Sequence, residues 1–171
     1  MRIAIISETW PPEINGVALT VHGLATGLAR RGHAIEVIRP RQSKHDAHGD
    51  DPVEAGMQTV HVPGVALPRY PGLRFGLPAG GLLARRWRKC RPDAVYIATE
   101  GPLGWSALRI ARKLGIAAAT GFHTRFDSYA EHYGLGWLSP WVRKYLRHFH
   151  CRAQATLVPT KALADELRAL G

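Results

Sequence analysis

Short apolar runs alternate with helix-like patterns along most of this sequence. Residues 2–7 (RIAIIS) form a branched apolar run that a Pro-Pro pair soon follows, as expected of a buried parallel strand. Residues 17–31 place their valines and leucines at steps of four, three and four, which predicts one apolar helix face, with Gly32 as the C-cap. Residues 34–39 (AIEVIR) predict a second strand. The chain therefore opens with a strand, helix, strand unit of the α/β type.

The same alternation continues to the end of the chain. The further predicted elements are a strand at 58–62, a helix near 80–90, a strand at 93–99, a helix at 103–114, a strand at 116–122, helices at about 126–133 and 138–152, a strand at 155–159 and a helix from 161. Residues 40–56 are polar and residues 63–81 are rich in Pro and Gly, so both are predicted to be loops. This order predicts a Rossmann-like, doubly wound and mostly parallel sheet, whose ligands bind beyond the carboxyl ends of the strands.

Composition narrows the class of protein. With 171 residues, 46% of them apolar, the chain can bury the core of one domain. No run reaches 18 apolar residues, and Glu8 interrupts the first run too early for a secretory signal, so we expect a cytosolic protein. The two cysteines, Cys90 and Cys151, have no paired spacing, which argues against a disulfide framework and against redox chemistry.

The net charge of +10 calls for an anionic partner or surface, although a well-solvated basic surface is the alternative. Part of the excess lies in two segments that mix basic with large apolar residues, 82–91 (LLARRWRKCR) and 138–152 (LSPWVRKYLRHFHCR). In the second segment Trp141, Tyr145 and Phe149 are spaced four apart. Such a helix either lies on an anionic membrane surface or turns its apolar stripe to the core. The presence of two such segments strengthens the membrane hypothesis.

The first candidate site is the strand-to-helix junction at residues 8–17 (ETWPPEINGV). Gly16 falls where the first helix exposes free N–H groups and a partial positive charge, so a phosphate could bind there. The alternative is that Gly16 only permits a tight turn. The dinucleotide fingerprint and the phosphate-loop pattern do not occur in this junction. An NADP-dependent enzyme that uses Arg39 and Arg41 is therefore disfavoured.

Two further junctions carry polar residues to the same edge of the predicted sheet. Residues 121–129 (GFHTRFDSY) follow a strand and contain His123. A single histidine is more often structural than catalytic, but its position after a strand strengthens the case for a catalytic role. Glu100 lies in the junction at residues 99–104 (TEGPLG) and is either a cleft residue or simply a charge at a helix N-terminus.

Other classes of function have less support. His148 and His150 are two apart on a predicted helix and do not share a face, so we assign no metal site. The sequence has no Gly-x-Ser-x-Gly motif, which disfavours hydrolase chemistry. A non-enzymatic basic module that binds nucleic acid fits the charge, but no recognised nucleic-acid motif supports it.

Together, the three junctions resemble the N-terminal domain of the family-four retaining glycosyltransferases, in particular the mannosyl- and glucosyltransferases that modify lipids and polysaccharides. The segments that carry the resemblance are IISET (5–9) with Pro11-Pro12 and Gly16-Val17, EGPLG (100–104), FHT (122–124) with Phe126 and Tyr129, and VPT (158–160). They span essentially the whole chain.

The resemblance implies one half of a GT-B enzyme, in which two Rossmann-like domains face each other across the active site. Residues 1–171 would be the single N-terminal, acceptor-side domain, inactive without a C-terminal domain that supplies most donor contacts. The implied reaction moves a hexose, mannose or glucose, from a nucleotide diphosphate sugar to a lipid or glycan hydroxyl at the cytoplasmic membrane surface. It needs no cofactor besides the donor substrate, no metal and no nucleic acid.

The resemblance also assigns site residues. Gly16, Val17 and Asn15 would contact the phosphate or sugar of the donor, with Asn15 where many members have a glycine. His123 falls on the active-site histidine, near the donor sugar. The resemblance implies front-face substitution in which the leaving diphosphate helps to deprotonate the acceptor, so no general base is assigned. A protein nucleophile is also not assigned. The residues expected to contact the acceptor are Arg69, Tyr70, Glu100, Thr124, Arg125 and Tyr129.

Overall fold

The computed structural model describes residues 1–41, 56–66, 74–123 and 139–169. The elements are, in chain order, β1 (Arg2–Ile6), α1 (Gly16–Arg30), β2 (Ala34–Pro40), β3 (Met57–Val62), β4 (Gly64–Ala66), β5 (Arg74–Gly76), α2 (Gly80–Lys89), β6 (Ala94–Ile97), α3 (Pro102–Lys113), β7 (Ala117–Gly121), α5 (Ser139–His150), β8 (Ala155–Leu157) and α6 (Lys161–Ala169). The helix predicted at 126–133 lies outside the described residues.

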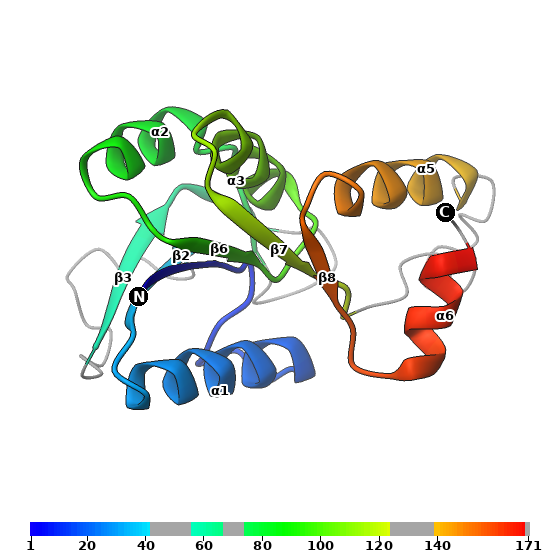
Figure 1. The fold of residues 1–171 in the computed structure, drawn as a ribbon, viewed down its shortest axis with the longest axis horizontal. Coiled ribbons are helices and arrows are strands. Elements are labelled where there is room, and N and C mark those ends of the chain that lie inside the picture. The colour runs from blue at the N-terminus through cyan, green and yellow to red at the C-terminus, as the bar shows by residue number, and fades with distance from the viewer. Residues whose placement is uncertain (42–55, 67–73, 124–138, 170–171) are drawn as a thin grey trace.

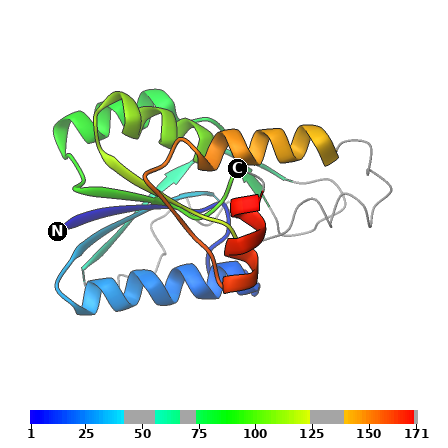
Figure 2. The same cartoon turned by 45° about the vertical axis from the view of Figure 1, so that its right-hand side comes forward.

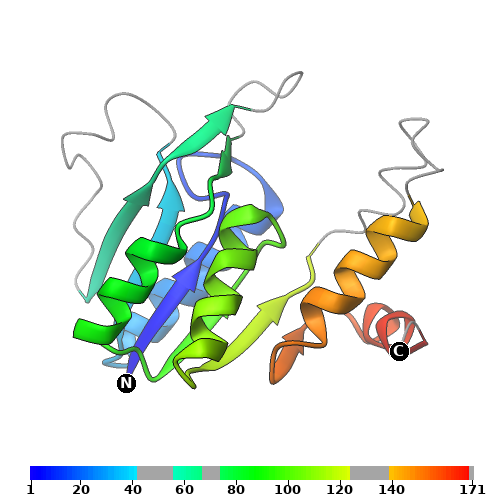
Figure 3. The same ribbon diagram turned by 90° about the horizontal axis from the view of Figure 1, so that it is seen from above.

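Six strands form one parallel sheet in the order β3-β2-β1-β6-β7-β8 (Figures 1 and 3). The prediction of a Rossmann-like α/β fold is therefore confirmed. The chain moves outward from β1 to β3 and then returns to β6 on the other side of β1. This reversal creates a switch point between the carboxyl ends of β1 and β6, where open α/β sheets bind their ligands.

Helices cover both faces of the sheet, with α1 on one face and α2 and α3 on the other (Figure 1). Successive residues of β1 point to opposite faces, so Ile5 packs with Val21 of α1 while Ile6 packs with Leu83 and Leu108 on the far side. Helix α5 lies on the α2 and α3 side (Figure 2), where Phe149 completes the larger cluster.

A short hairpin occupies part of the predicted loop at 63–81. Strands β4 and β5 pair antiparallel, and the Arg74 guanidinium donates a hydrogen bond to the Gly64 carbonyl oxygen at 2.7 Å. A Cβ atom on Gly76 would stand 2.8 Å from the Leu103 side chain, so the hairpin packs closely against the start of α3. Each strand has only three residues, too few for alternation to reveal it in the sequence.

In the basic segment at 82–91 the aromatic residue is buried, which the membrane hypothesis did not predict. Trp87, its aromatic residue, is 1% exposed, and its indole N–H donates to Glu36 of β2 at 3.3 Å. Arg86 binds the other oxygen of the same carboxylate at 2.5 Å. The large aromatic of α2 therefore belongs to the core, and only the basic side of this helix is left for an anionic partner.

Glu8 connects the two loops that meet at the switch point. Its backbone N–H donates to Thr99 Oγ1 at 3.0 Å, and its Oε1 accepts a hydrogen bond from the Leu103 N–H, in the first turn of α3, at 3.2 Å. Both carboxyl oxygens would lie only 2.2 Å from a Cβ atom on Gly101. A side chain at position 101 would therefore have to displace the Glu8 carboxyl group, and Gly101 leaves the space that this group occupies.

Replacing Glu8 with Gln should make stability less dependent on pH. Burial raises the pKa of the Glu8 carboxyl from 4.5 to about 8, with the Glu100 charge adding to burial and the Leu103 hydrogen bond opposing it. Between those two values the folded chain holds a proton that the unfolded chain has released, so stability falls as pH rises, by at most about 1.4 kcal/mol per pH unit. Urea unfolding of wild type and Glu8→Gln between pH 5 and about 8 measures this slope.

The matched control is Asp93→Asn, which removes a surface carboxylate that accepts from the Arg2 N–H at the amino end of the sheet. It should leave the slope in place. An equal slope for wild type and Glu8→Gln would show that Glu8 is already ionised across this range.

Candidate functional site

The three predicted junctions follow β1, β6 and β7, which are adjacent strands of the sheet. Glu8, Glu100 and His123 are therefore brought to the same edge, at and beside the switch point. Electrostatic coupling connects them, because the Glu100 charge acts on the pKa of both Glu8 and His123. The structure thus assembles one polar wall from segments more than 100 residues apart in sequence.

The loop between β1 and α1 is braced by its own side chains. The Thr9 hydroxyl donates to Glu13 Oε2 at 2.5 Å, and the Asn15 amide donates to Thr9 Oγ1 at 2.6 Å. Asn15 Oδ1 in turn accepts from the Ala18 N–H at 2.8 Å and so caps α1. The Asn15 side chain is thus engaged at both ends, and it holds the loop against the start of α1.

Gly16 and Val17 form the first turn of α1. Their N–H groups donate to no acceptor within the described residues, as is usual where a helix begins. Gly16 is not among the glycines with positive φ, and a Cβ atom placed on it would meet no described atom within 4 Å. The tight-turn explanation for this glycine is therefore not supported. Its place at an exposed helix start fits the anion-binding prediction.

His123 follows β7 and contacts Tyr96 of β6. His123 Nε2 and the Tyr96 hydroxyl lie 2.7 Å apart, and the two rings meet edge to face. Burial lowers the pKa of His123, although the Glu100 charge partly opposes it. Burial, and then the Glu100 charge, raise the pKa of Tyr96 to about 12. A neutral imidazole beside a neutral phenol is the resulting state near pH 7.

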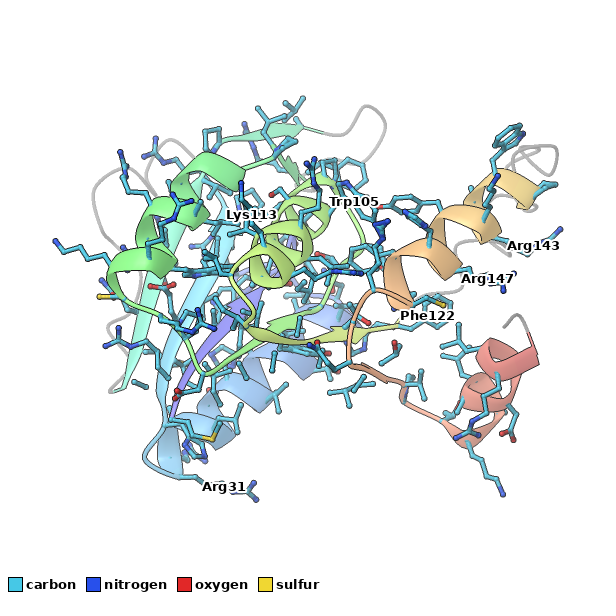
Figure 4. The ribbon with its side chains drawn as sticks, turned by 45° about the horizontal axis from the view of Figure 1, so that its top comes forward. Arg31, Trp105, Lys113, Phe122, Arg143 and Arg147 are labelled. Atoms are coloured by element: carbon cyan, nitrogen blue, oxygen red, sulfur yellow. The ribbon has the colours of Figure 1, made fainter. Side chains whose placement is uncertain are left out.

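Glu100 is 7% exposed and lies against α5. Its carboxylate Oε1 is 3.4 Å from His150 Nε2, and its backbone carbonyl accepts a hydrogen bond from the Tyr145 hydroxyl. Thr120 of β7 holds the other ring nitrogen of His150 at 2.8 Å. Phe122, labelled at the end of β7 in Figure 4, packs edge to face on the same ring. Glu100 thus connects the carboxyl edge of the sheet to α5.

The other residues predicted to contact an acceptor cannot be placed. Arg69, Tyr70, Thr124, Arg125 and Tyr129 lie outside the described residues. Their assignment stays a prediction.

Sequence reasoning did not identify Tyr96, Tyr145 or His150 as neighbours of the site. Tyr96 could have been found from the sequence. It is a polar residue near the carboxyl end of the predicted strand at 93–99, and the next predicted strand along the chain leads to His123. The two α5 residues carry no such signal, because the sequence does not show which loop their helix packs against.

The arrangement suits binding and positioning of a polar ligand. In the described part of the chain no group of three His, Cys, Asp or Glu residues is arranged to hold a metal ion. None of the described helices combines the length and the apolar composition required to cross a bilayer.

Two curated proteins similar to this chain are sugar transferases. The chain is 32% identical over 169 residues to a GDP-mannose-dependent alpha-mannosyltransferase of Mycolicibacterium smegmatis, covering 99% of this chain and 44% of that protein. It is also 32% identical to an alpha-monoglucosyldiacylglycerol synthase of Acholeplasma laidlawii, covering 98% of this chain and 42% of that protein. The chain therefore spans less than half the length of either relative.

Solved structures support the fold. A UDP-N-acetylglucosamine 2-epimerase from Methanocaldococcus jannaschii matches 99% of this chain and 42% of its own with a TM-score of 0.54 at 16% identity, which speaks for the fold alone. Residues 14–171 match the sequence model of Glycosyltransferase Family 4. This match covers nearly all of the chain and confirms the resemblance seen in its motifs: the chain belongs to Glycosyltransferase Family 4.

Proposed function

We propose that residues 1–171 form the N-terminal, acceptor-side domain of a retaining GT-B glycosyltransferase. The observation that carries this proposal is the polar wall at the switch point of a family 4 domain, where Gly16, Glu100 and His123 converge on one sheet edge. The partial coverage of the relatives supports a second, C-terminal domain opposite this wall. The domain prepares a site that it does not complete alone.

The reaction proposed is transfer of a hexose from a nucleotide diphosphate sugar to a lipid or glycan hydroxyl. Mannose is the first choice of sugar because the M. smegmatis relative is described as GDP-mannose-dependent, and glucose is the second because of the A. laidlawii relative. A lipid acceptor is supported by the same glucosyldiacylglycerol synthase.

Each part of the wall has a role in this proposal. The N–H groups of Gly16 and Val17, at the positive end of α1, receive the donor phosphate or the sugar beside it. His123 contacts the donor sugar. No side chain is assigned as general base, because the leaving diphosphate helps to deprotonate the acceptor, and no side chain is assigned as nucleophile. The domain contributes fixed dipoles around the developing charge.

The exposed side of α5 is the proposed contact with an anionic membrane. Trp141 is 68% exposed, and Lys144 Nζ lies 6.0 Å from the centre of its ring. Arg143 and Arg147 project from the same helix away from the sheet (Figure 4), whereas Phe149 and Leu146 are buried. An exposed aromatic among basic residues is typical of a surface that binds lipid headgroups. The nucleic-acid alternative gains no support from the comparisons.

Replacing His123 with Ala should lower transfer strongly. In a polypeptide that joins this chain to a family 4 C-terminal half, we expect kcat/KM with GDP-mannose to fall about a hundredfold, the usual effect of losing one fixed hydrogen-bonding group. Initial rates with GDP-mannose and a diacylglycerol acceptor measure this.

His33→Ala is the matched control. His33 precedes β2 at the amino end of the sheet, and its Nδ1 is 3.5 Å from the terminal amine. The control should retain the wild-type rate. Wild-type turnover by His123→Ala would remove His123 from the mechanism.

Removing positive charge from α5 should weaken binding to anionic vesicles. Because each basic residue near such a surface contributes about 1 kcal/mol, Arg143→Gln with Lys144→Gln should weaken binding by about thirtyfold. Co-sedimentation with phosphatidylcholine vesicles, with and without phosphatidylglycerol, at two salt concentrations measures this.

The control is Arg31→Gln, at the far end of α1 (Figure 4), which removes an exposed charge away from α5. Unchanged vesicle binding by the double variant would exclude α5 as the contact. Steeply salt-dependent binding to an oligonucleotide, with no preference for anionic lipid, would favour the nucleic-acid module instead.

A further inference from the structure

We propose that Tyr96 is a positioning residue that holds His123 as the neutral Nδ1–H tautomer, so that the imidazole presents a hydrogen-bond donor to a hydroxyl oxygen of the sugar substrate. The proposal deepens the function proposed above and rests on the assignment of His123 to the sugar site.

The contact follows from strand register. Strands β6 and β7 pair in parallel with Tyr96 opposite Ala119, and every second residue from there along β7 faces the same side of the sheet. Gly121 and His123 continue that series towards the carboxyl end. The Tyr96 side chain therefore runs along β7 until its hydroxyl reaches His123 Nε2 at 2.7 Å.

Gly121 leaves the space in which the two groups meet. A Cβ atom on this residue would stand 2.4 Å from the Tyr96 hydroxyl and 2.5 Å from His123 Nε2. Both are closer than real Cβ contacts allow, so any larger residue would have to separate the phenol from the imidazole. Gly121 is a β7 residue without positive φ, so its lack of a side chain, rather than its backbone freedom, is what this position uses.

Charge fixes the direction of the hydrogen bond. Since the pKa of Tyr96 is about 12, the phenol keeps its proton near pH 7 and can donate it. Burial lowers the pKa of His123, so the imidazole is neutral and has one donor and one acceptor nitrogen. The charged group that acts on both residues is Glu100, whose negative charge further discourages ionisation of the phenol.

The tautomer determines what His123 offers to a ligand. With Nε2 accepting from Tyr96, the ring proton resides on Nδ1, which has no hydrogen-bond partner among the described residues. A neutral N–H donor matches a sugar hydroxyl oxygen, and it attracts a phosphate less strongly than an imidazolium would. The N–H groups at the start of α1 remain for the phosphate. In this proposal the sugar end of the substrate contacts the His123 imidazole, and the phosphate end contacts the backbone N–H groups at the start of α1.

Nuclear magnetic resonance of residues 1–171 labelled with ¹⁵N-histidine tests the proposal without any ligand. The ¹⁵N shifts and two-bond couplings of His123, above its pKa, report which nitrogen carries the proton. Wild type should show the proton on Nδ1 and a coupling across the hydrogen bond between the Tyr96 hydroxyl proton and Nε2. Tyr96→Phe should abolish that coupling and shift the population towards Nε2–H, the form that free histidine prefers in water. Gly121→Ala should do the same by separating the groups.

Tyr145→Phe is the matched control, because it removes another partly buried hydroxyl that binds the Glu100 carbonyl and not His123. It should leave the His123 tautomer unchanged. An Nε2–H tautomer in the wild-type chain, or an unchanged Nδ1–H signal in Tyr96→Phe, would overturn the proposal. The wild-type spectrum decides the matter even if a variant does not fold. Because the experiment measures no sugar transfer, its result does not depend on whether the proposed activity is correct.

Discussion

The site depends on the contact between Glu8, in the loop after β1, and the loop that follows β6. At the switch point two loops must approach each other closely, and here a carboxyl group bonds the start of α3 while its oxygens lie against a glycine that has no Cβ. With its pKa raised to about 8, this carboxyl is largely neutral at pH 7, which reduces the cost of its burial. This contact helps to fix the position of Glu100 in the loop after β6. The charge of Glu100 in turn acts on the pKa of Tyr96, Tyr145 and His123.

Sequence patterns predicted the fold well because its main constraints are local. The apolar spacing in α1 and the buried runs of β1 and β2 are each recognisable within a short stretch of sequence. The C-cap of α1 is Arg31 rather than the predicted Gly32, and Gly32 follows it with the positive φ that is common just after a helix. Their order along the chain is enough to predict a parallel sheet and the edge at which ligands bind. The hairpin of β4 and β5 escaped prediction because a strand of three residues is too short to show a recognisable alternation.

The site was less predictable because its contacts depend on register and on distant packing. The junction residues follow from topology, but the bond between Tyr96 and His123 depends on how β6 and β7 align and on the missing side chain of Gly121. The neighbours of Glu100 depend on how α5 packs against the sheet. Likewise, only packing separates the buried Trp87 from the exposed Trp141, although both stand among basic residues in the sequence.

We propose that this domain supplies one wall of the active site and that catalysis needs a second domain. Sugar transfer from GDP-mannose to a diacylglycerol acceptor, measured for residues 1–171 alone and again after a family 4 C-terminal half is supplied, tests it most directly. We expect transfer only when both halves are present. Robust transfer by residues 1–171 alone would contradict it.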